Sequence, residues 1–392
     1  MVIIRPEIGE DVTMEFASVA REMNKKNIDI ISFGLGEPDF STPKHIIDAS
    51  KKALDQDPYR RYSNPLGLYE LRKEISIREK RVNKNEINPE NIIVTPGVKQ
   101  ALFLSLLSTL EPEDEIINFS PSYVCYIPDI YLAEPNAVIK NIKLKNDFTI
   151  NMDELKNNIT DKTKVILINS PHNPTGKMIS KTERDEIAKI AIEKNIYIIS
   201  DEIYDMMCFT EKEHFGFGTI NELKDLVITI NGFSKAYSMT GWRIGYAIAP
   251  THLINTMRKI QLHTNTNTCG FIQMGALEAL RGDHSHLTKF NSELVDKVKI
   301  MTKYLGEDVM TSPTEGGFFS FLNISKTGLS SNAFSAQFIK ECRVATSPGI
   351  AFGKEWDTHI RVSLIEDVER FHEGIVKLAS FISKYEEINK RV

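Results

Sequence analysis

The sequence predicts an α/β protein in which an open, mostly parallel sheet has helices on both faces and is joined to a smaller α+β domain. Short runs rich in β-branched residues alternate with segments of helical periodicity through the middle of the chain, a pattern typical of parallel sheets. The chain has 392 residues, which is long for one hydrophobic core and favours two packed domains.

The expected elements of the sheet follow one another between residues 92 and 249. The expected strands are Ile92–Val94, Glu115–Phe119, Val165–Ile168, Ile196–Ile199, Leu226–Ile230 and Ile244–Ala249. Helices are expected at Gln100–Leu110 and Thr182–Asn195. Ligands of such sheets bind beyond the carboxyl ends of the strands. Because Asn173, Asp201 and Lys235 each follow an expected strand, we expect them to meet in one crevice.

The last hundred residues have a different pattern. Strands are expected at Gly316–Ile324, Cys342–Thr346 and His359–Ile365, between long amphipathic helices. This pattern predicts a separate α+β domain, and the N-terminal stretch with its helix-like Glu15–Lys26 is expected to pack with it. The predicted division is an N-terminal segment 1–45, a large domain 46–284 and a small domain 285–392.

Composition excludes several classes of function. Hydrophobic residues make up 41% and charged residues 26%, as in globular proteins. The net charge of -5 argues against a nucleic-acid partner, which would require a basic surface. The four scattered cysteines lack a Cys-x-x-Cys pair, so we expect reduced thiols and no metal site. With no leader-like N-terminus and no membrane-length apolar run, the sequence predicts a cytoplasmic protein without a membrane partner.

The most informative motif is Asn-Gly-Phe-Ser-Lys-Ala-Tyr-Ser-Met-Thr-Gly-Trp-Arg-Ile-Gly, residues 231–245. A desolvated lysine amine such as that of Lys235 can form a Schiff base. Arg243 supplies a planar fork that suits a phosphate group. Pyridoxal phosphate (PLP) is an aldehyde that carries a phosphate and would use both. A lone lysine is more often a solvated surface charge, but the surrounding glycines and hydroxyls favour the cofactor site.

Further motifs extend this pattern over nearly the whole chain. They are Gly36–Phe40, Tyr62–Arg72, Pro96–Gln100, Asn169–Gly176, Ser200–Tyr204, Pro348–Gly353 and Arg361–Ser363. With the Lys235 motif, and in this order, they resemble class I (fold type I) PLP-dependent aminotransferases. The resemblance is to the branch that holds archaeal and bacterial aspartate and aromatic aminotransferases. It implies the PLP-dependent transferase fold type I, with a mostly parallel seven-stranded sheet and a smaller domain.

The resemblance implies three catalytic residues, Lys235, Asp201 and Tyr204, and Asn173 as a binding residue beside them. Lys235 would hold the cofactor as a Schiff base and then move the substrate α-proton. Asp201 would pair with the pyridine nitrogen, so that the ring accepts electrons from the carbanion. Tyr204 and Asn173 would hydrogen-bond the phenolic oxygen, with Asn173 also near the substrate. Taken alone, Asp201 could be a helix N-cap and Asn173 could form an Asx turn before Pro174.

The resemblance also implies the residues that hold the cofactor ring and phosphate. Tyr123 would stack on the ring, although a core tyrosine is the alternative. Arg243 and the backbone of Gly97, Val98 and Lys99 would bind the phosphate at a helix N-terminus.

A neighbouring subunit would contribute to the same phosphate site. Tyr62 would reach the phosphate from that subunit, which predicts a homodimer with shared active sites. Some relatives have serine where this chain has Gly232, so one hydroxyl contact to the phosphate is absent. Ser234 is only a weak candidate for a cofactor contact.

For the substrate, the resemblance implies that Arg361 and the backbone of Gly36 bind the α-carboxylate. Lys99 and Thr13 stand where relatives hold the side-chain carboxylate of aspartate. The expected reaction is ping-pong transfer of an amino group between an L-amino acid, first of all aspartate, and 2-oxoglutarate. Aromatic candidates around the pocket, namely Phe16, Tyr123 and Phe352, make an aromatic aminotransferase the alternative. A PLP-dependent carbon–sulfur β-lyase is a further alternative, since one fold hosts several chemistries.

Overall fold

The computed structural model describes residues 22–23, 25–210 and 214–390. Its helices are α2 Lys44–Leu54, α3 Asp57–Arg60, α4 Tyr69–Val82, α5 Val98–Thr109, α6 Tyr126–Ala133, α7 Met152–Asn158, α8 Lys181–Lys194, α9 Thr251–Thr264, α10 Gly270–Arg281, α11 Ser285–Tyr304, α12 Ser331–Cys342 and α13 Val368–Asn389. Its strands are β1 Ile31–Ser32, β2 Ile92–Thr95, β3 Glu115–Ser120, β4 Val138–Lys143, β5 Thr163–Asn169, β6 Tyr197–Asp201, β7 Val227–Gly232, β8 Gly245–Ile248, β9 Phe319–Asn323, β10 Val344–Ala345, β11 Ser347–Pro348 and β12 His359–Ser363.

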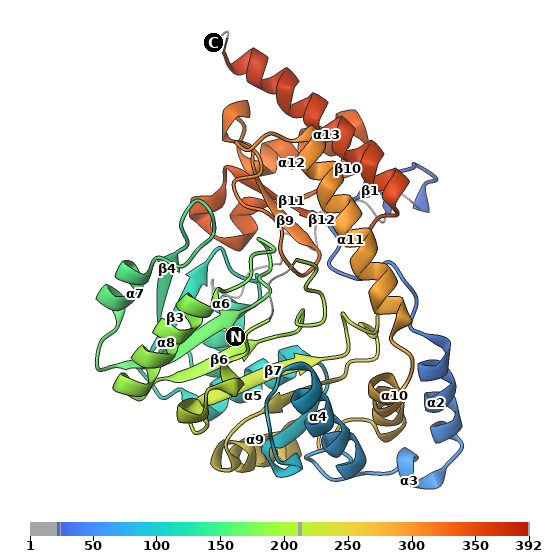
Figure 1. Ribbon diagram of the computed structural model, residues 1–392, viewed down its shortest axis with the longest axis vertical. Coiled ribbons are helices and arrows are strands. Elements are labelled where there is room, and N and C mark those ends of the chain that lie inside the picture. Colours follow the sequence, from blue (N-terminus) through green and yellow to red (C-terminus); the bar gives the residue numbers. More distant parts are fainter. Residues whose placement is uncertain (1–21, 24, 211–213, 391–392) are drawn as a thin grey trace, which may run out of the picture.

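A seven-stranded sheet forms the centre of the larger lobe (Figure 1). Its strand order is β2-β8-β7-β6-β5-β3-β4. Only β8 runs antiparallel, pairing with β2 on one side and β7 on the other. The remaining pairs are parallel, so β5, β6 and β7 all end at the same edge. The predicted fold class, a mostly parallel sheet with helices, is confirmed.

Side chains of the strands alternate between two buried faces, as the two-residue repeat of a strand requires. On β3, β5 and β6, one face receives Ile116, Leu167 and Ile199, and the other receives Ile117, Ile166 and Ile198. Helices α5, α6 and α9 cover the first face. Helix α8 covers the second face, and α2, α4 and α10 continue that layer over β2 and β8. Burial on both faces explains the β-branched runs in the sequence.

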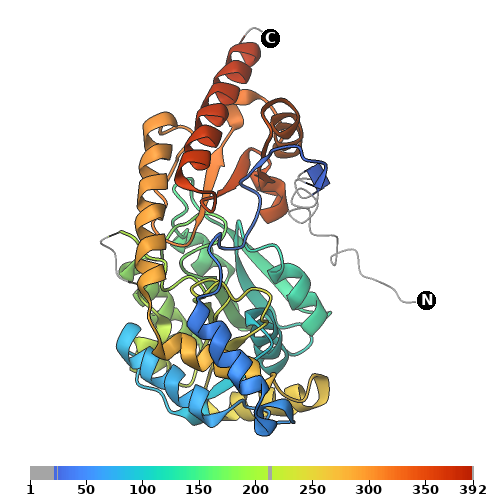
Figure 2. The same ribbon diagram turned by 90° about the vertical axis from the view of Figure 1, so that its right-hand side faces the viewer.

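A second, antiparallel sheet of three strands, β11-β12-β9, lies in the smaller lobe at the top of Figure 1. Its core includes aromatic side chains from α11, α12 and α13. The N-terminal part of the chain joins this lobe, because β1 pairs in parallel with β10 (Figure 2). That pairing supports the predicted packing of the N-terminal segment, while the domain limits at residues 45 and 284 stay a prediction.

The predicted strands of both sheets are present, most of them within one or two residues of the expected ends. Two differences have physical causes. The strand expected from Cys342 begins only at Val344, because Cys342 ends α12 and Arg343 caps that helix in a left-handed conformation. Strand β4 has no counterpart in the sequence predictions, because it lies at the sheet edge with mostly exposed or half-buried side chains. Within the described residues, every helix is too short or too polar to cross a lipid bilayer.

Candidate active site

A cavity of about 350 Å³ lies at the carboxyl ends of β5, β6 and β7, and its size is typical of small-molecule sites. Residues from both lobes line it. Those anticipated from the sequence are Gly36, Val98, Lys99, Tyr123, Asn173, Asp201, Tyr204, Lys235, Arg243 and Arg361. The convergence expected for the residues after three strands is therefore present in the structure.

Asp201 is the last residue of β6 and is buried at the base of the cavity. Its two oxygens accept hydrogen bonds from Tyr126 Oη at 2.8 Å and from the Ile203 amide at 3.2 Å. Burial raises the pKa of Asp201 to about 6, although the Tyr126 hydrogen bond acts in the opposite direction. The carboxylate is thus held in one orientation while remaining ionised at neutral pH.

Lys235 lies three residues beyond β7, and its Nζ donates to the Gly36 carbonyl at 2.6 Å. Burial, together with the cations Arg361 and Arg243, lowers the pKa of Lys235 to about 8 against the opposing charges of Glu37 and Asp201. A lysine with such a pKa has a substantial neutral fraction near physiological pH. It can therefore act as a nucleophile or as a base.

Asn169, the last residue of β5, ties the neighbouring strand ends together. Its Oδ1 accepts from the Asn173 amide at 2.8 Å, and its Nδ2 donates to the Asp201 carbonyl at 2.9 Å. The Asn173 loop is then followed by α8, which begins with a capping box between Ser180 and Glu183. These local contacts fix Asn173 relative to Asp201.

Arg361 projects from β12 of the smaller lobe and is 5% exposed. Its Nη1 donates to Asn173 Oδ1 at 3.2 Å, and its Nη2 donates to the Gly34 carbonyl and to Ser347 Oγ at 3.1 and 3.2 Å. The guanidinium also lies over the ring of Phe319, 4.3 Å from its centroid. A planar cation held on several sides is suited to grip a carboxylate.

The N-terminus of α5 lies beside Arg243 at another wall of the cavity. Gly97 has φ +84°, and a β-carbon there would come 2.5 Å from Arg243 Nη2. A β-carbon at Gly245 would come 2.6 Å from the Val98 amide nitrogen. Glycine at both positions thus lets the helix end and the guanidinium approach closely, which builds an anion site from amides and a cation.

Comparison with known proteins agrees with this arrangement. Residues 28–375 match the family model for aminotransferase class I and II. The chain belongs to this family. It is 37% identical to the aspartate aminotransferase of Pyrococcus abyssi over 89% of this chain and 91% of that protein. It is 34% identical to aromatic-amino-acid aminotransferase 2 of Thermococcus litoralis over 91% of this chain and 92% of that protein.

A solved structure gives the same result for the fold. The aspartate aminotransferase of Thermotoga maritima superimposes with a TM-score of 0.89 at 33% identity, covering 97% of this chain and 100% of that one. The resemblance read from the motifs is therefore confirmed, and the protein is a transaminase.

Some of the expected residues do not line this cavity. Tyr62, which is expected to serve the cavity of a neighbouring subunit, is 88% exposed and does not line that of its own chain. Phe352 was expected among the aromatic residues of the pocket, but it is buried with Arg361 over its ring, 4.9 Å from the centroid. Gly97 shapes the wall through Arg243 without lining the cavity. Thr13 and Phe16 lie outside the described residues.

Other residues line the cavity of the aminotransferase without having been expected there. They include Leu35, Glu37, Leu102, Tyr126, Asp129 and Phe319. A usable signal existed for two of them. Tyr126 and Asp129 follow Tyr123 at steps of three residues, and side chains at that spacing share one face of a helix.

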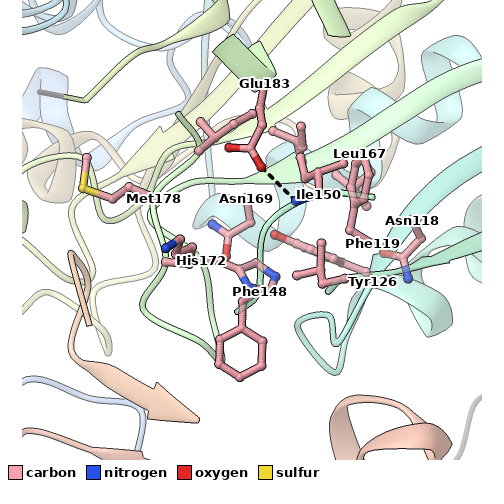
Figure 3. A pocket seen from close by; sticks show the side chains of 14 residues that line it. Asn118, Phe119, Tyr126, Phe148, Ile150, Leu167, Asn169, His172, Met178 and Glu183 are labelled. Carbon is pink, nitrogen blue, oxygen red and sulfur yellow. Dashed lines mark hydrogen bonds between the residues drawn. The ribbon is translucent and has the colours of Figure 1, made fainter. Parts of the chain in front are cut away.

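A second, much smaller cavity of about 40 Å³ lies behind Tyr126 and Asn169, which line both spaces (Figure 3). Two of its polar groups are engaged in the protein. Glu183 Oε1 accepts from the Ile150 amide at 2.8 Å, and His172 Nδ1 pairs with Thr175 Oγ1 at 2.8 Å. The volume suits a few water molecules and is far below that of a substrate site.

Proposed function

We propose that this aminotransferase uses PLP to move the amino group between an L-amino acid, first of all aspartate, and 2-oxoglutarate by a ping-pong mechanism. The observation that carries the proposal is the meeting of Lys235, Asp201 and Arg361 in one cavity of about 350 Å³. A desolvated amine, a buried carboxylate and a fixed guanidinium are the groups that this reaction requires.

The cavity fits PLP in its charges and its shape. Arg243 and the amides of Val98 and Lys99 at the start of α5 would hold the phosphate, in the space that glycine at position 97 keeps open. Asp201 would hold the pyridine nitrogen, and Tyr123 the ring face. Asn173 and Tyr204 would hydrogen-bond the phenolic oxygen, while Ser234 also lines the cavity.

When bound, PLP supplies an aldehyde that condenses with amines and a ring that delocalises the electrons left at the substrate α-carbon. The residues of the chain do the remaining work. Lys235, with its pKa of about 8, would take the proton from the substrate α-carbon and deliver it to the cofactor carbon that receives the amino group. Asp201 keeps a proton on the pyridine nitrogen through its ionised form. Tyr204, buried against Phe318 and Phe319, stays neutral because burial raises its pKa.

Arg361 orients the substrate by its α-carboxylate. Its guanidinium is already bound to Asn173, Gly34 and Ser347, so little side-chain freedom is lost when a substrate binds. The Gly36 amide lies at the same cavity and would add a second donor, while the Gly36 carbonyl accepts from Lys235. The loop at Gly36 would thus contact both the substrate carboxylate and the catalytic amine of Lys235.

Aspartate is the first candidate donor because the Pyrococcus abyssi and Thermotoga maritima relatives carry that name and because Lys99 lines the cavity. An ammonium at this place would favour a second carboxylate on the substrate. Thr13 is proposed, with Lys99, as a residue for the side-chain carboxylate of aspartate. The second candidate, an aromatic donor, is favoured by Tyr123 and Phe319 in the lining and by the name of the Thermococcus litoralis relative.

A homodimer with shared active sites is part of the proposal. Tyr62 is exposed on its own chain, as a residue that serves a neighbouring cavity would be. Mixing Tyr62→Phe subunits with Lys235→Ala subunits would test the sharing. Each homodimer carries its substitution at both sites, whereas a mixed dimer has one site with both native residues.

A cytoplasmic location also stays a prediction.

The function is tested with purified enzyme loaded with PLP and a panel of amino donors with 2-oxoglutarate. We expect glutamate to form and the cofactor absorbance to change on addition of donor alone, with aspartate the best donor. Lys235→Ala should abolish turnover, whereas Lys189→Ala, which removes an exposed lysine of α8, should not.

Two results would contradict the proposal. Pyruvate released from a sulfur-containing donor without any oxoacid would indicate the β-lyase. Retention of turnover and of the lysine-bound cofactor absorbance in Lys235→Ala would refute the cofactor assignment.

A further inference from the structure

One end of the active-site cavity lies between α5 and α6 and carries both signs of charge. Lys99 and Leu102 reach it from α5, and Tyr126 and Asp129 reach it from α6. Lys99 is the residue that would attract a substrate carboxylate, as aspartate would present. Asp129 adds a carboxyl group at the same end, and no part of the aminotransferase mechanism above uses it.

The contacts of Lys99 place its ammonium against α6. Lys99 Nζ donates to Cys125 Sγ at 3.0 Å. Asp129 follows Cys125 by one helical turn, with its amide donating to the Cys125 carbonyl at 2.9 Å. Residues four apart share one face of a helix, so the ammonium and the carboxyl group lie on the same side of α6. The Lys99 charge lowers the pKa of Asp129, but burial outweighs it and raises that pKa to about 6.

Asp129 is held differently from Asp201, the other buried carboxyl group of the cavity. Both oxygens of Asp201 accept hydrogen bonds, whereas Asp129 Oδ2 accepts none from the described residues. The Asp129 residue is nevertheless only 8% exposed. A buried carboxylate oxygen without a hydrogen-bond partner is destabilising, so its presence at a ligand site indicates a role toward the ligand.

We propose that Asp129 is a specificity-determining residue that offsets the attraction of Lys99 for a second substrate carboxylate and so opens the site to neutral and aromatic side chains. The inference rests on the proposed aminotransferase function. Its physical basis is the different solvation of the two charges. Lys99 is exposed and therefore screened by water, whereas the buried Asp129 carboxylate acts through a medium of lower dielectric constant.

This arrangement has a consequence for the substrate range. A dicarboxylic substrate meets attraction and repulsion at the same end of the cavity, while an aromatic side chain meets Leu102 and the tyrosine rings. The enzyme is therefore expected to accept both aspartate and aromatic donors. Removal of the Asp129 carboxylate alone should make the enzyme more selective for dicarboxylic substrates.

The test compares Asp129→Asn, Lys99→Met and the double variant with wild type, all loaded with PLP and assayed well above the pKa of Asp129. The readout is the ratio of kcat/KM for aspartate to that for phenylalanine. We expect Asp129→Asn to raise this ratio by about three- to tenfold and Lys99→Met to lower it by a similar factor. Asp161→Asn, which removes a fully exposed carboxylate, is the matched control and should leave the ratio unchanged.

A binding measurement gives an independent readout. Calorimetric titration of the loaded enzyme with succinate and with 3-phenylpropionate should show the same change in the ratio of the two Kd values. Unchanged ratios in a folded Asp129→Asn variant would overturn the inference. Wild-type enzyme that turns over no donor would instead overturn the proposed function itself.

Discussion

The side chain of Val98 fills the space that a β-carbon at position 232 would need. Such a β-carbon would lie 2.7 Å from Val98 Cγ2, well inside contact distance. Gly232 ends β7 and pairs with Gly245 of β8, directly under the start of α5. Val98 therefore occupies the space that a serine at position 232, as in some relatives, would need.

Gly232→Ser should therefore destabilise the protein by about 1–3 kcal/mol through overpacking, and Val98→Gly in the same chain should relieve part of that cost. The check is the thermal midpoint of the two single variants and the double variant. We expect the thermal midpoint of the double variant to fall by less than the sum of the decreases in the two single variants. Strict additivity would mean that Val98 and Gly232 do not compete for the same space.

Gly97→Ala should weaken PLP binding. The position has φ +84°, which is strained for any residue with a β-carbon, and that carbon would lie 2.5 Å from Arg243 Nη2. Displacement of Arg243 and of the first amides of α5 should lower the affinity for PLP by at least about tenfold, as the loss of a charge-assisted contact does. Titration of the cofactor-depleted protein with PLP measures this.

The matched control for that substitution is Gly306→Ala, where the added carbon would meet no atom within 4 Å. Its PLP affinity should equal that of wild type. Equal affinities for all three proteins would show that Gly97 does not shape the phosphate site.

Much of the site followed from the sequence because parallel strands deliver their last residues to one edge. Asn173, Asp201 and Lys235 needed only the order of the strands to be placed together. Arg361 needed the family resemblance, because it comes from β12 in the other lobe and no local pattern relates it to the large sheet.

The residues that were not anticipated depend on packing between elements. Asp129 faces the cavity only because α6 lies against α5, and Phe319 does so only because β9 of the smaller lobe approaches Asn173 and Arg361. The spacing of Tyr126 and Asp129 places both on one face of α6 but does not show which element that face meets, and Phe319 has no comparable signal. Strand β4 was likewise missed because an edge strand with exposed side chains lacks the apolar pattern of the buried strands.

Arg361→Lys should lower kcat/KM for every α-amino acid donor by about a hundredfold, mainly through a higher KM. Lysine keeps the charge but cannot bind a carboxylate with two parallel hydrogen bonds or occupy the place over Phe319. Arg281→Lys, on the exposed side of α10, is the control and should behave as wild type. A variant whose kcat falls while its KM stays constant would assign Arg361 to the chemical step instead of to binding.

Tyr126→Phe should make cofactor binding more sensitive to acid. The pKa of Asp201 is about 6, above the ordinary value of 3.8, because burial disfavours its ionised form. The carboxylate is therefore present above that pH and is lost as the pH falls, so PLP affinity should decline on the acid side. The Tyr126 hydroxyl, 2.8 Å from Asp201 Oδ2, favours the ionised form.

Loss of that hydroxyl should raise the pKa of Asp201 and move the acid decline of PLP affinity to higher pH. The affinity on the plateau should fall by about tenfold, as expected for one hydrogen bond to a charged group. The measurement is PLP affinity as a function of pH for wild type, Tyr126→Phe and the exposed control Tyr69→Phe. A decline at the same pH in all three proteins would mean that Tyr126 does not tune Asp201, and that burial alone fixes the charge facing the pyridine nitrogen.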